Sequence, residues 1–274
     1  MTMAFINTLY NLWPNGDKLI PGLRDGIANA APTVFPKYGI TTPLLVAHAM
    51  AQFSEECGAG LELVENDNFT AEQLLRVFPT HFTASMAERY AHNPRMICDL
   101  AYGGRMGNAP PPSDDGYNYR GRGMSQVTGK DGYQALQTEL NKGGAGIDVV
   151  ATPSLVYDPR YVLLCGVADF VLCGCLPYAQ KNDVVGVSAM LNDGHIVKPS
   201  QINGLASREQ WLKRWVAAQP MVSVVAQPPA LPTQQTAIAA QQTAAPAAAP
   251  ERSVKDLFVE LANVIDNLKS RISA

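Results

Sequence analysis

Acidic residues with contrasting surroundings lie on both sides of a short glycine-containing segment early in the chain. Glu55 and Glu56 end an apolar run, and Glu65 begins a polar run that continues through residues 66–68. If the apolar run is a helix, the partial negative charge of its last turn and the neighbouring acid favour a protonated carboxyl at Glu56. Glu65 is expected to stay ionised in its polar surroundings. Such a pair suits acid/base catalysis, although spacing alone also fits solvated acids at a helix end.

The segments that must position these acids are predicted to be helical. Thr42 followed by Pro43 is a typical helix start and Gly58 is a typical residue after a helix end, so a helix is expected between them. Thr70 and Gln73 match a capping box, which predicts a second helix over the sequence TAEQLLRVF. A Pro/Gly-rich loop is expected at residues 108–123. Signals for strands are few, so the expected fold class is mainly α.

Composition argues against several classes of function. The 274 residues are 47% hydrophobic, which is enough for a sizeable core, and their net charge of −3 argues against nucleic-acid binding. The longest apolar stretch, residues 161–176, contains Asp169 and is too short to cross a bilayer. It is predicted to be a buried helix, and no transmembrane segment is expected. The N-terminus lacks the basic segment and cleavage site of a secretory signal peptide.

Metal and cysteine chemistry are not indicated by the sequence. The five cysteines form no disulfide framework, and Cys173 and Cys175 have no histidine nearby in sequence. The four histidines show no spacing typical of metal ligands. Cys57 is not accompanied by any cysteine-peptidase motif. No metal and no cofactor are therefore expected.

The chain is predicted to have three parts. Residues 1–222 alternate helical patterns with loops and are expected to form one catalytic domain, residues 223–250 are an Ala/Pro/Gln-rich linker, and residues 251–274 an amphipathic helix. The apolar stripe over residues 253–272 favours self-association into a homo-oligomer. Docking onto the catalytic domain, a partner protein and a membrane surface are the alternatives.

Several motifs, in the same order, resemble glycoside hydrolase family 19, in the branch that includes bacteriophage endolysins. AQFSEECG at residues 51–58 is similar to Ala-Gln-x-x-His-Glu-Ser-Gly, and ENDNFTAEQLL is similar to Glu-Asn-x-Asn-Tyr-Ser-Ala-Glu-x-Leu-Leu. FPTHF, YAHNPRMICDLAYGGRMGN, GYNYRGRGMSQVTGKDGY, LNDG and NGLASR resemble later motifs, so the resemblance covers about residues 8 to 216. The chain departs from the pattern at Glu55 (His in the family), Gly132 (Asn) and Asp193 (Gly).

The resemblance implies roles for individual residues. Glu56 corresponds to the catalytic acid, Glu65 to the second catalytic carboxylate that activates water, and Thr128 helps to hold that water. The residues implied in substrate binding are Gln126, Asn68, Tyr119, Tyr133 and Asn192, and those implied in cleft structure are Arg120, Arg122 and Arg208. Ion pairing by Arg120 and Arg122, packing by the tyrosines together with Tyr117, and a polar-core role for Gln126 and Thr128 remain open alternatives.

The resemblance also implies a fold and an activity. The fold would be the lysozyme-like α+β class, mainly helical, with two lobes and a central substrate cleft. The reaction would be inverting hydrolysis of β-1,4 links in polymers of N-acetylated amino sugars. Bacterial cell-wall glycan is the favoured substrate, with chitin as the alternative, and a non-catalytic glycan-binding or assembly protein is a third possibility. An endolysin is expected to stay in the cytoplasm of the host bacterium until it is released to the periplasm and cell wall.

Overall fold

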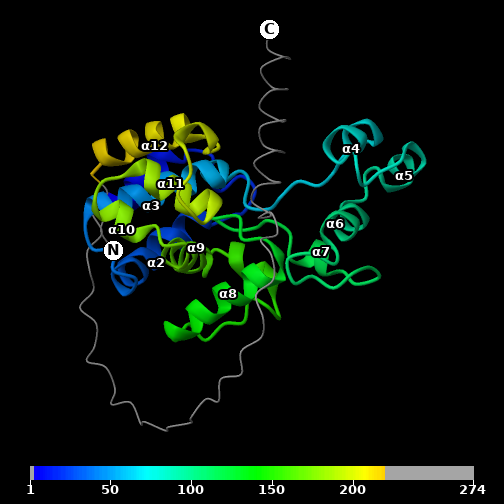
Figure 1. Cartoon of the computed structure of the whole chain (residues 1–274). Helices are drawn as coiled ribbons and strands as arrows, with labels where there is room; N and C mark the ends of the chain where they lie inside the picture. Colours follow the sequence, from blue (N-terminus) through cyan, green and yellow to red (C-terminus); the bar gives the residue numbers. More distant parts are fainter. Residues whose placement is uncertain (1–2, 220–274) are drawn as a thin grey trace, which may run out of the picture.

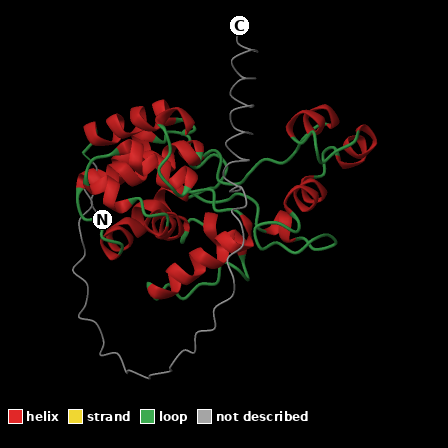
Figure 2. Ribbon diagram, in the orientation of Figure 1, coloured by secondary structure: helices red, strands yellow, loops and turns green. Residues whose placement is uncertain are grey.

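The computed structural model of the protein describes residues 3–219, and their regular structure is helical (Figure 2). Isolated antiparallel bridges join residue 122 to residues 64 and 127. The helices in chain order are α1 (Met3–Leu12), α2 (Leu23–Lys37), α3 (Pro43–Glu56), η1 (Gly58–Gly60), α4 (Ala71–Val77), α5 (Ala84–Tyr90), α6 (Pro94–Tyr102), α7 (Asp115–Asn118), α8 (Gly129–Lys142), η2 (Pro153–Tyr157), α9 (Val162–Leu172), α10 (Leu176–Gln180), α11 (Val184–Asp193), η3 (Pro199–Gln201) and α12 (Leu205–Ala217).

The helices form two groups (Figure 1). We call α1–α3 with α8–α12 the large lobe, and α4–α7 the small lobe. One extended apolar cluster occupies the large lobe, whereas the small lobe has two smaller clusters, one with Leu74 and Phe82 and one with Cys98 and Tyr102. Separate buried clusters indicate that each lobe is held together by its own core. The predicted mainly α class is confirmed, and a substrate cleft between the lobes stays a prediction.

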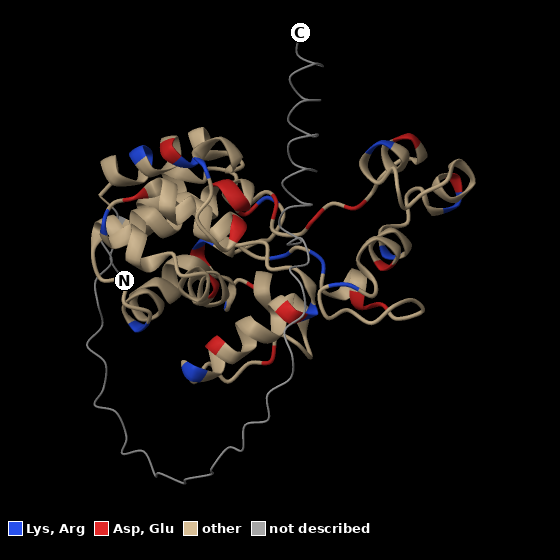
Figure 3. Ribbon diagram, in the orientation of Figure 1, with Lys and Arg blue, Asp and Glu red and all other residues tan. Residues whose placement is uncertain are grey.

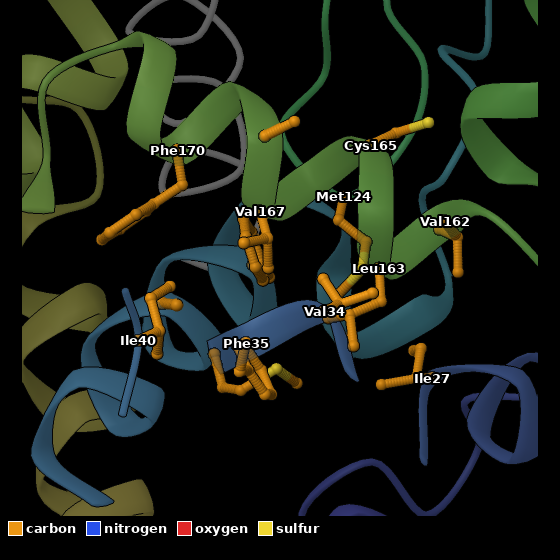
Figure 4. Packing of buried hydrophobic residues seen from close by; sticks show 14 of the residues in the cluster. Ile27, Val34, Phe35, Ile40, Met124, Val162, Leu163, Cys165, Val167 and Phe170 are labelled. Atoms are coloured by element: carbon orange, nitrogen blue, oxygen red, sulfur yellow. The ribbon is translucent and has the colours of Figure 1, made fainter. Parts of the chain in front are cut away.

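The core of the large lobe gives the fold its rigid part. Ile27 and Phe35 of α2 and Leu163 and Val167 of α9 are fully buried in one cluster (Figure 4). Burying a side chain of this size contributes about 1.5–3 kcal/mol. The predicted helix within residues 161–176 is confirmed as α9, but it ends at Leu172 because the chain turns through Gly174, which has a φ of 75°.

Ser54 on α3 connects this helix to both ends of the described chain. The indole N–H groups of Trp13 and Trp215 donate to the Ser54 hydroxyl at 2.8 and 2.9 Å, and the hydroxyl donates to the Met50 carbonyl at 2.6 Å. All of these side chains are buried. Because buried polar groups must be hydrogen-bonded, this junction fixes α3 against α12, and Glu56 stands at the end of a rigid helix.

The predicted boundaries of α3 and α4 are confirmed. The Thr42 hydroxyl accepts the Leu45 N–H at 3.3 Å, and α3 runs from Pro43 to Glu56. Thr70 and Gln73 exchange both hydrogen bonds of a capping box, at 2.7 and 3.2 Å. The segment expected to be a loop at residues 108–123 contains the short helix α7.

The predicted linker and C-terminal helix lie outside the described residues, as does the end of the expected catalytic domain at residue 222. Within residues 3–219, no helix is long and apolar enough to span a membrane.

Candidate active site

The two chain segments that connect the lobes pair with each other. Residues 57–70 lead from α3 to α4, and residues 119–128 lead from α7 to α8. The Glu65 N–H donates to the Gly121 carbonyl at 2.9 Å, and the Gly123 N–H donates to the Leu63 carbonyl at 2.8 Å. Figure 3 shows acidic positions on the first segment and basic positions on the second. This short antiparallel pairing brings motifs together that are about 60 residues apart in sequence.

The Glu65 carboxyl is held by donors from the second connecting segment and from α6. The Tyr102 hydroxyl donates to Oε1 at 2.8 Å, and the Gly121 N–H donates to Oε2 at 3.2 Å. Burial and the negative charge of Asp67 raise the pKa of Glu65 to about 8, although both hydrogen bonds oppose the shift. The expectation that polar surroundings keep Glu65 ionised is therefore wrong. The neighbouring residues are polar, but one of them, Asp67, is a buried acid.

Arg120 and Arg122 organise the second connecting segment. The Arg120 Nε lies 3.5 Å from the Asp67 Oδ2, and its guanidinium lies 3.9 Å from the centre of the Tyr117 ring. Arg122 is buried and donates to the carbonyl groups of Tyr117 and Asn118. Arg120 thus forms an ion pair, as the alternative expected, whereas Arg122 stabilises the backbone of residues 117 and 118.

Gly121 is the point at which three predicted site residues converge. A Cβ atom at this position would lie 3.0 Å from the Gln126 Oε1 and 3.3 Å from both the Glu65 Oε2 and the Thr128 Oγ1. The missing side chain leaves room for these polar atoms around one backbone position. Gln126 is anchored there by donating to the Glu62 carbonyl at 2.9 Å, and the Thr128 hydroxyl donates to the Gln126 carbonyl at 2.8 Å.

Glu56 has a cationic partner that sequence reasoning did not anticipate. The Arg208 Nη2 donates to the Glu56 Oε1 at 2.8 Å, across 152 residues of sequence. The same guanidinium donates to the Gln52 Oε1 at 2.7 Å and to the Asn203 carbonyl at 2.9 Å. Gln52 stands one helical turn before Glu56, so both face Arg208 from α3. Arg208, expected only to have a structural role, directly contacts the candidate acid.

Glu55, which departs from the family pattern, does not share the environment of Glu56. The Ser207 hydroxyl, at the start of α12, donates to the Glu55 Oε2. The Glu55 Oε1 lies 2.5 Å from the position that a Cβ of Gly204 would occupy. Glu55 therefore joins the end of α3 to the start of α12.

Tyr119 and Tyr133 are part of the large-lobe core. They are 7% and 0% exposed, and their rings meet edge to face at 5.2 Å between centroids. Their hydroxyls donate to the carbonyls of Val150 and Arg120 at 3.0 and 3.4 Å. The packing alternative describes both residues, because both side chains are buried in the core.

Asn68 and Asn192 are not brought to the Gly121 position by the contacts they make. Asn68 is exposed, and its Oδ1 lies 3.0 Å from the Nδ1 of His92 in the small lobe. Asn192 is half-buried near the end of α11, where its amide donates to Asp193 at 3.4 Å. Substrate contact by either residue stays a prediction.

Sequence reasoning also missed three residues that shape the site, namely Tyr102, Asp67 and Gly121. Tyr102 and Gly121 lie within segments that resemble family motifs, but nothing in the spacing shows that they meet Glu65. Asp67 occupies a variable motif position and has the type of a surface residue. In residues 3–219, no group of three or more His, Cys, Asp or Glu side chains is arranged to hold a metal ion.

A mainly helical protein that holds two carboxyl groups in different environments, beside a polar cluster, has the site composition of a glycosidase. No protein-family model matches the chain. A Haemophilus influenzae protein named glycosyl hydrolase family 19 domain-containing protein is 32% identical over 209 residues, which cover 76% of this chain and 94% of that protein. The chain belongs to glycosyl hydrolase family 19. This membership supports a glycoside hydrolase in general.

Proposed function

We propose that this protein is a peptidoglycan-degrading glycosidase of the endolysin type. It hydrolyses β-1,4 links of N-acetylated amino-sugar polymers and inverts the anomeric centre. The observation that carries the proposal is the convergence of Glu65, Gln126 and Thr128 around Gly121, with Glu56 fixed at the end of α3. Family membership supports glycosidic chemistry. The motif resemblance in the sequence is the ground for proposing the endolysin branch.

In the proposed reaction the two carboxyl groups divide the proton transfers. Glu56 donates a proton to the oxygen of the leaving sugar, and Glu65 accepts a proton from the attacking water. A carboxylate whose pKa is raised is a stronger base when ionised, so the raised pKa of the half-buried Glu65 suits this role. The Thr128 hydroxyl uses its hydrogen to bind the Gln126 carbonyl, which leaves its oxygen lone pairs to accept a hydrogen bond from water.

Inversion sets a condition that product analysis can test. The water must fit between the sugar and Glu65, which requires carboxyl groups about 6.5–9.5 Å apart. We expect the first product to have the opposite anomeric configuration from the substrate, measured by NMR within the first minutes of reaction. Retained configuration would instead indicate a covalent intermediate and remove the water-activating role of Glu65.

Zymography distinguishes the proposed function from its alternatives. The full chain and a Glu56→Gln variant are run on gels that contain either peptidoglycan or chitin. Clearing of peptidoglycan by the wild type alone supports the proposal, and clearing of chitin alone indicates a chitinase. Binding to either polymer without any clearing indicates a non-catalytic glycan-binding protein.

Two further parts of the proposal concern location and assembly. The endolysin type implies residence in the host cytoplasm until release to the cell wall. The apolar stripe over residues 253–272, outside the described part of the structure, is proposed to mediate self-association. Light scattering on the full chain and on a chain that ends at Pro220 tests the second part, since equal monomer masses would contradict it.

A further inference from the structure

A buried carboxyl group, that of Asp67, lies beside the half-buried Glu65, and the proposed reaction gives it no role. Asp67 is 2% exposed, and its Oδ2 is buried without a hydrogen bond. The carboxyl groups of Glu65 and Asp67 act on each other, and the negative charge of Asp67 raises the pKa of Glu65. Repulsion between two neighbouring negative charges favours a proton on one of the two acids. A buried carboxylate is costly unless it is paired, so the groups around Asp67 must stabilise its charge.

The groups that face this acid pair come from several elements. α6 contributes the Tyr102 hydroxyl, which donates to Glu65, and the Cys98 thiol, which lowers the pKa of Asp67. The second connecting segment contributes the Gly121 N–H to Glu65 and the positive charges of Arg120 and Arg122 to Asp67.

The distribution of these partners makes the two acids unequal. Both cations act on Asp67, with the Arg120 Nε at 3.5 Å from its Oδ2, whereas the hydrogen bonds to Glu65 come from a hydroxyl and a backbone amide. Two adjacent carboxyl groups do not readily ionise together, and the proton goes to the one with less compensation. Asp67 is therefore the ionised member, and Glu65 carries the proton.

We propose that Asp67 is a positioning residue for Glu65: anchored by Arg120, its buried carboxylate orients the Glu65 carboxyl and sets the pH above which Glu65 can act as a base. This inference rests on the proposed role of Glu65 as the water-activating carboxylate. It assigns Asp67 no contact with the sugar. Loss of the Asp67 charge makes Glu65 easier to ionise and moves the onset of activity to lower pH.

The test is the pH dependence of kcat/KM for the full chain on the polymer that the wild type cleaves, peptidoglycan or chitin. Asp67→Asn keeps the shape and removes the charge, and we expect the acidic limb of the profile to move down by roughly one pH unit or more. Asp67→Glu restores the charge and should return the limb toward its wild-type position. Asp99→Asn is the matched control, because Asp99 is a half-buried acid of α6 that accepts the Tyr117 N–H at 2.8 Å. The acidic limb of the Asp99→Asn profile should stay at the wild-type pH.

If the Asp67→Asn variant folds and the acidic limb of its profile lies at the same pH as that of the wild type, the inference is overturned. If this variant does not fold, carboxyl ¹³C NMR on the labelled wild-type chain decides instead. Glu65 and Asp67 are then expected to show shared, two-step titrations, and independent single steps overturn the inference. The Glu65→Gln variant distinguishes a failure of the proposed function from a failure of the inference about Asp67. If Glu65→Gln stays active, the proposed function fails, and if it is inactive while the limb of Asp67→Asn is unmoved, only the inference about Asp67 fails.

Discussion

The two candidate catalytic carboxyl groups are held in opposite ways. Glu56 stands at the end of a rigid helix in the large lobe and contacts the buried guanidinium of Arg208 at 2.8 Å. Glu65 lies on a connecting segment, feels the negative charge of Asp67 and accepts a hydrogen bond from Tyr102 of the small lobe. One site is organised around a positive charge, and the other around burial and a negative charge.

This contrast shows which contacts can be changed without moving the other site. The environment of Glu56 comes from α3 and α12 and depends on the large-lobe core. The environment of Glu65 combines both lobes through the pairing of the connecting segments. Substitutions near Glu56 are therefore expected to affect stability and activity together, whereas those near Glu65 should affect activity and its pH dependence first.

The largest effect is expected from removing either carboxyl group. Glu56→Gln and Glu65→Gln should each lower kcat by about 10²–10⁴-fold, because general acid/base catalysis contributes that much. Initial rates on peptidoglycan or chitin measure the loss, and circular dichroism checks the fold. A variant that keeps more than about a tenth of the wild-type rate would show that its carboxyl group is not the one that transfers a proton.

A substitution of Arg208 tests whether the Glu56 site and the stability of the large lobe depend on the same contacts. Arg208→Leu should lower the free energy of unfolding by about 3–5 kcal/mol, because it leaves buried partners unpaired. Arg160→Gln is the control, since Arg160 pairs with Asp158 but its side chain is 71% exposed, and its loss should have little effect on stability. Urea unfolding measures both. Equal small losses would indicate that Arg208 contributes no more than a surface pair.

Local elements of this fold could be predicted from sequence, but the contacts between them could not. Thr42 and Gly58 mark the ends of α3, and Thr70 with Gln73 marks the start of α4, because capping depends on residues three or four positions apart. The contact between Glu56 and Arg208 joins residues 152 positions apart and depends on how α12 packs on α3.

The prediction that Glu65 stays ionised was wrong for the same reason, because it depends on contacts between elements. Its polar neighbours in sequence suggested a solvated carboxylate, whereas tertiary packing buries Asp67 beside it. Tyr119 and Tyr133 show the converse case. Their motif suggested sugar contact, but the core accommodates both rings, and edge-to-face packing of aromatic residues is a common core arrangement.

A substitution at Gly121 tests the geometry of the Glu65 site without altering any charge. Gly121→Ala places a Cβ at 3.0–3.3 Å from three polar side chains, which must then shift by a few tenths of an ångström. We expect kcat to fall by about 10–10²-fold with little change in stability, since small misplacements of catalytic groups are costly. Gly132→Ala on α8 is the control, because its Cβ would meet Val127 at an ordinary 3.5 Å. Equal activity of the two variants would contradict convergence at Gly121.

The protonated state of Glu65 predicts a pH dependence of stability. The pKa of Glu65 is about 8 in the folded protein and near 4.5 in the unfolded chain, so the folded protein binds more protons between these values. Its free energy of unfolding should therefore fall as pH rises through this range. Glu65→Gln has no proton to lose and should show a weaker fall between about pH 5 and pH 8.5 in urea unfolding. Parallel curves for variant and wild type would show that Glu65 ionises without cost.

The smallest expected effect has the opposite sign and arises from His48, on the same helix as Glu56. Its ring is buried, the Nε2 lies 2.9 Å from the Asn182 Oδ1, and Nδ1 has no hydrogen-bond partner. Burial lowers the pKa of His48 below its ordinary 6.5, although Asn182 and Asp183 oppose the shift.

The unfolded chain therefore takes up a proton at His48 at a higher pH than the folded protein does. Stability from this residue is present above about pH 6.5 and is lost as pH falls below that value. His48→Gln should reduce the loss of unfolding free energy between about pH 7.5 and pH 5.5, measured in the Glu65→Gln background so that the rising contribution of Glu65 is absent. If His48→Gln leaves this slope unchanged, α3 tolerates a charged ring, and the large lobe would be less tightly packed around Glu56 than its buried contacts indicate.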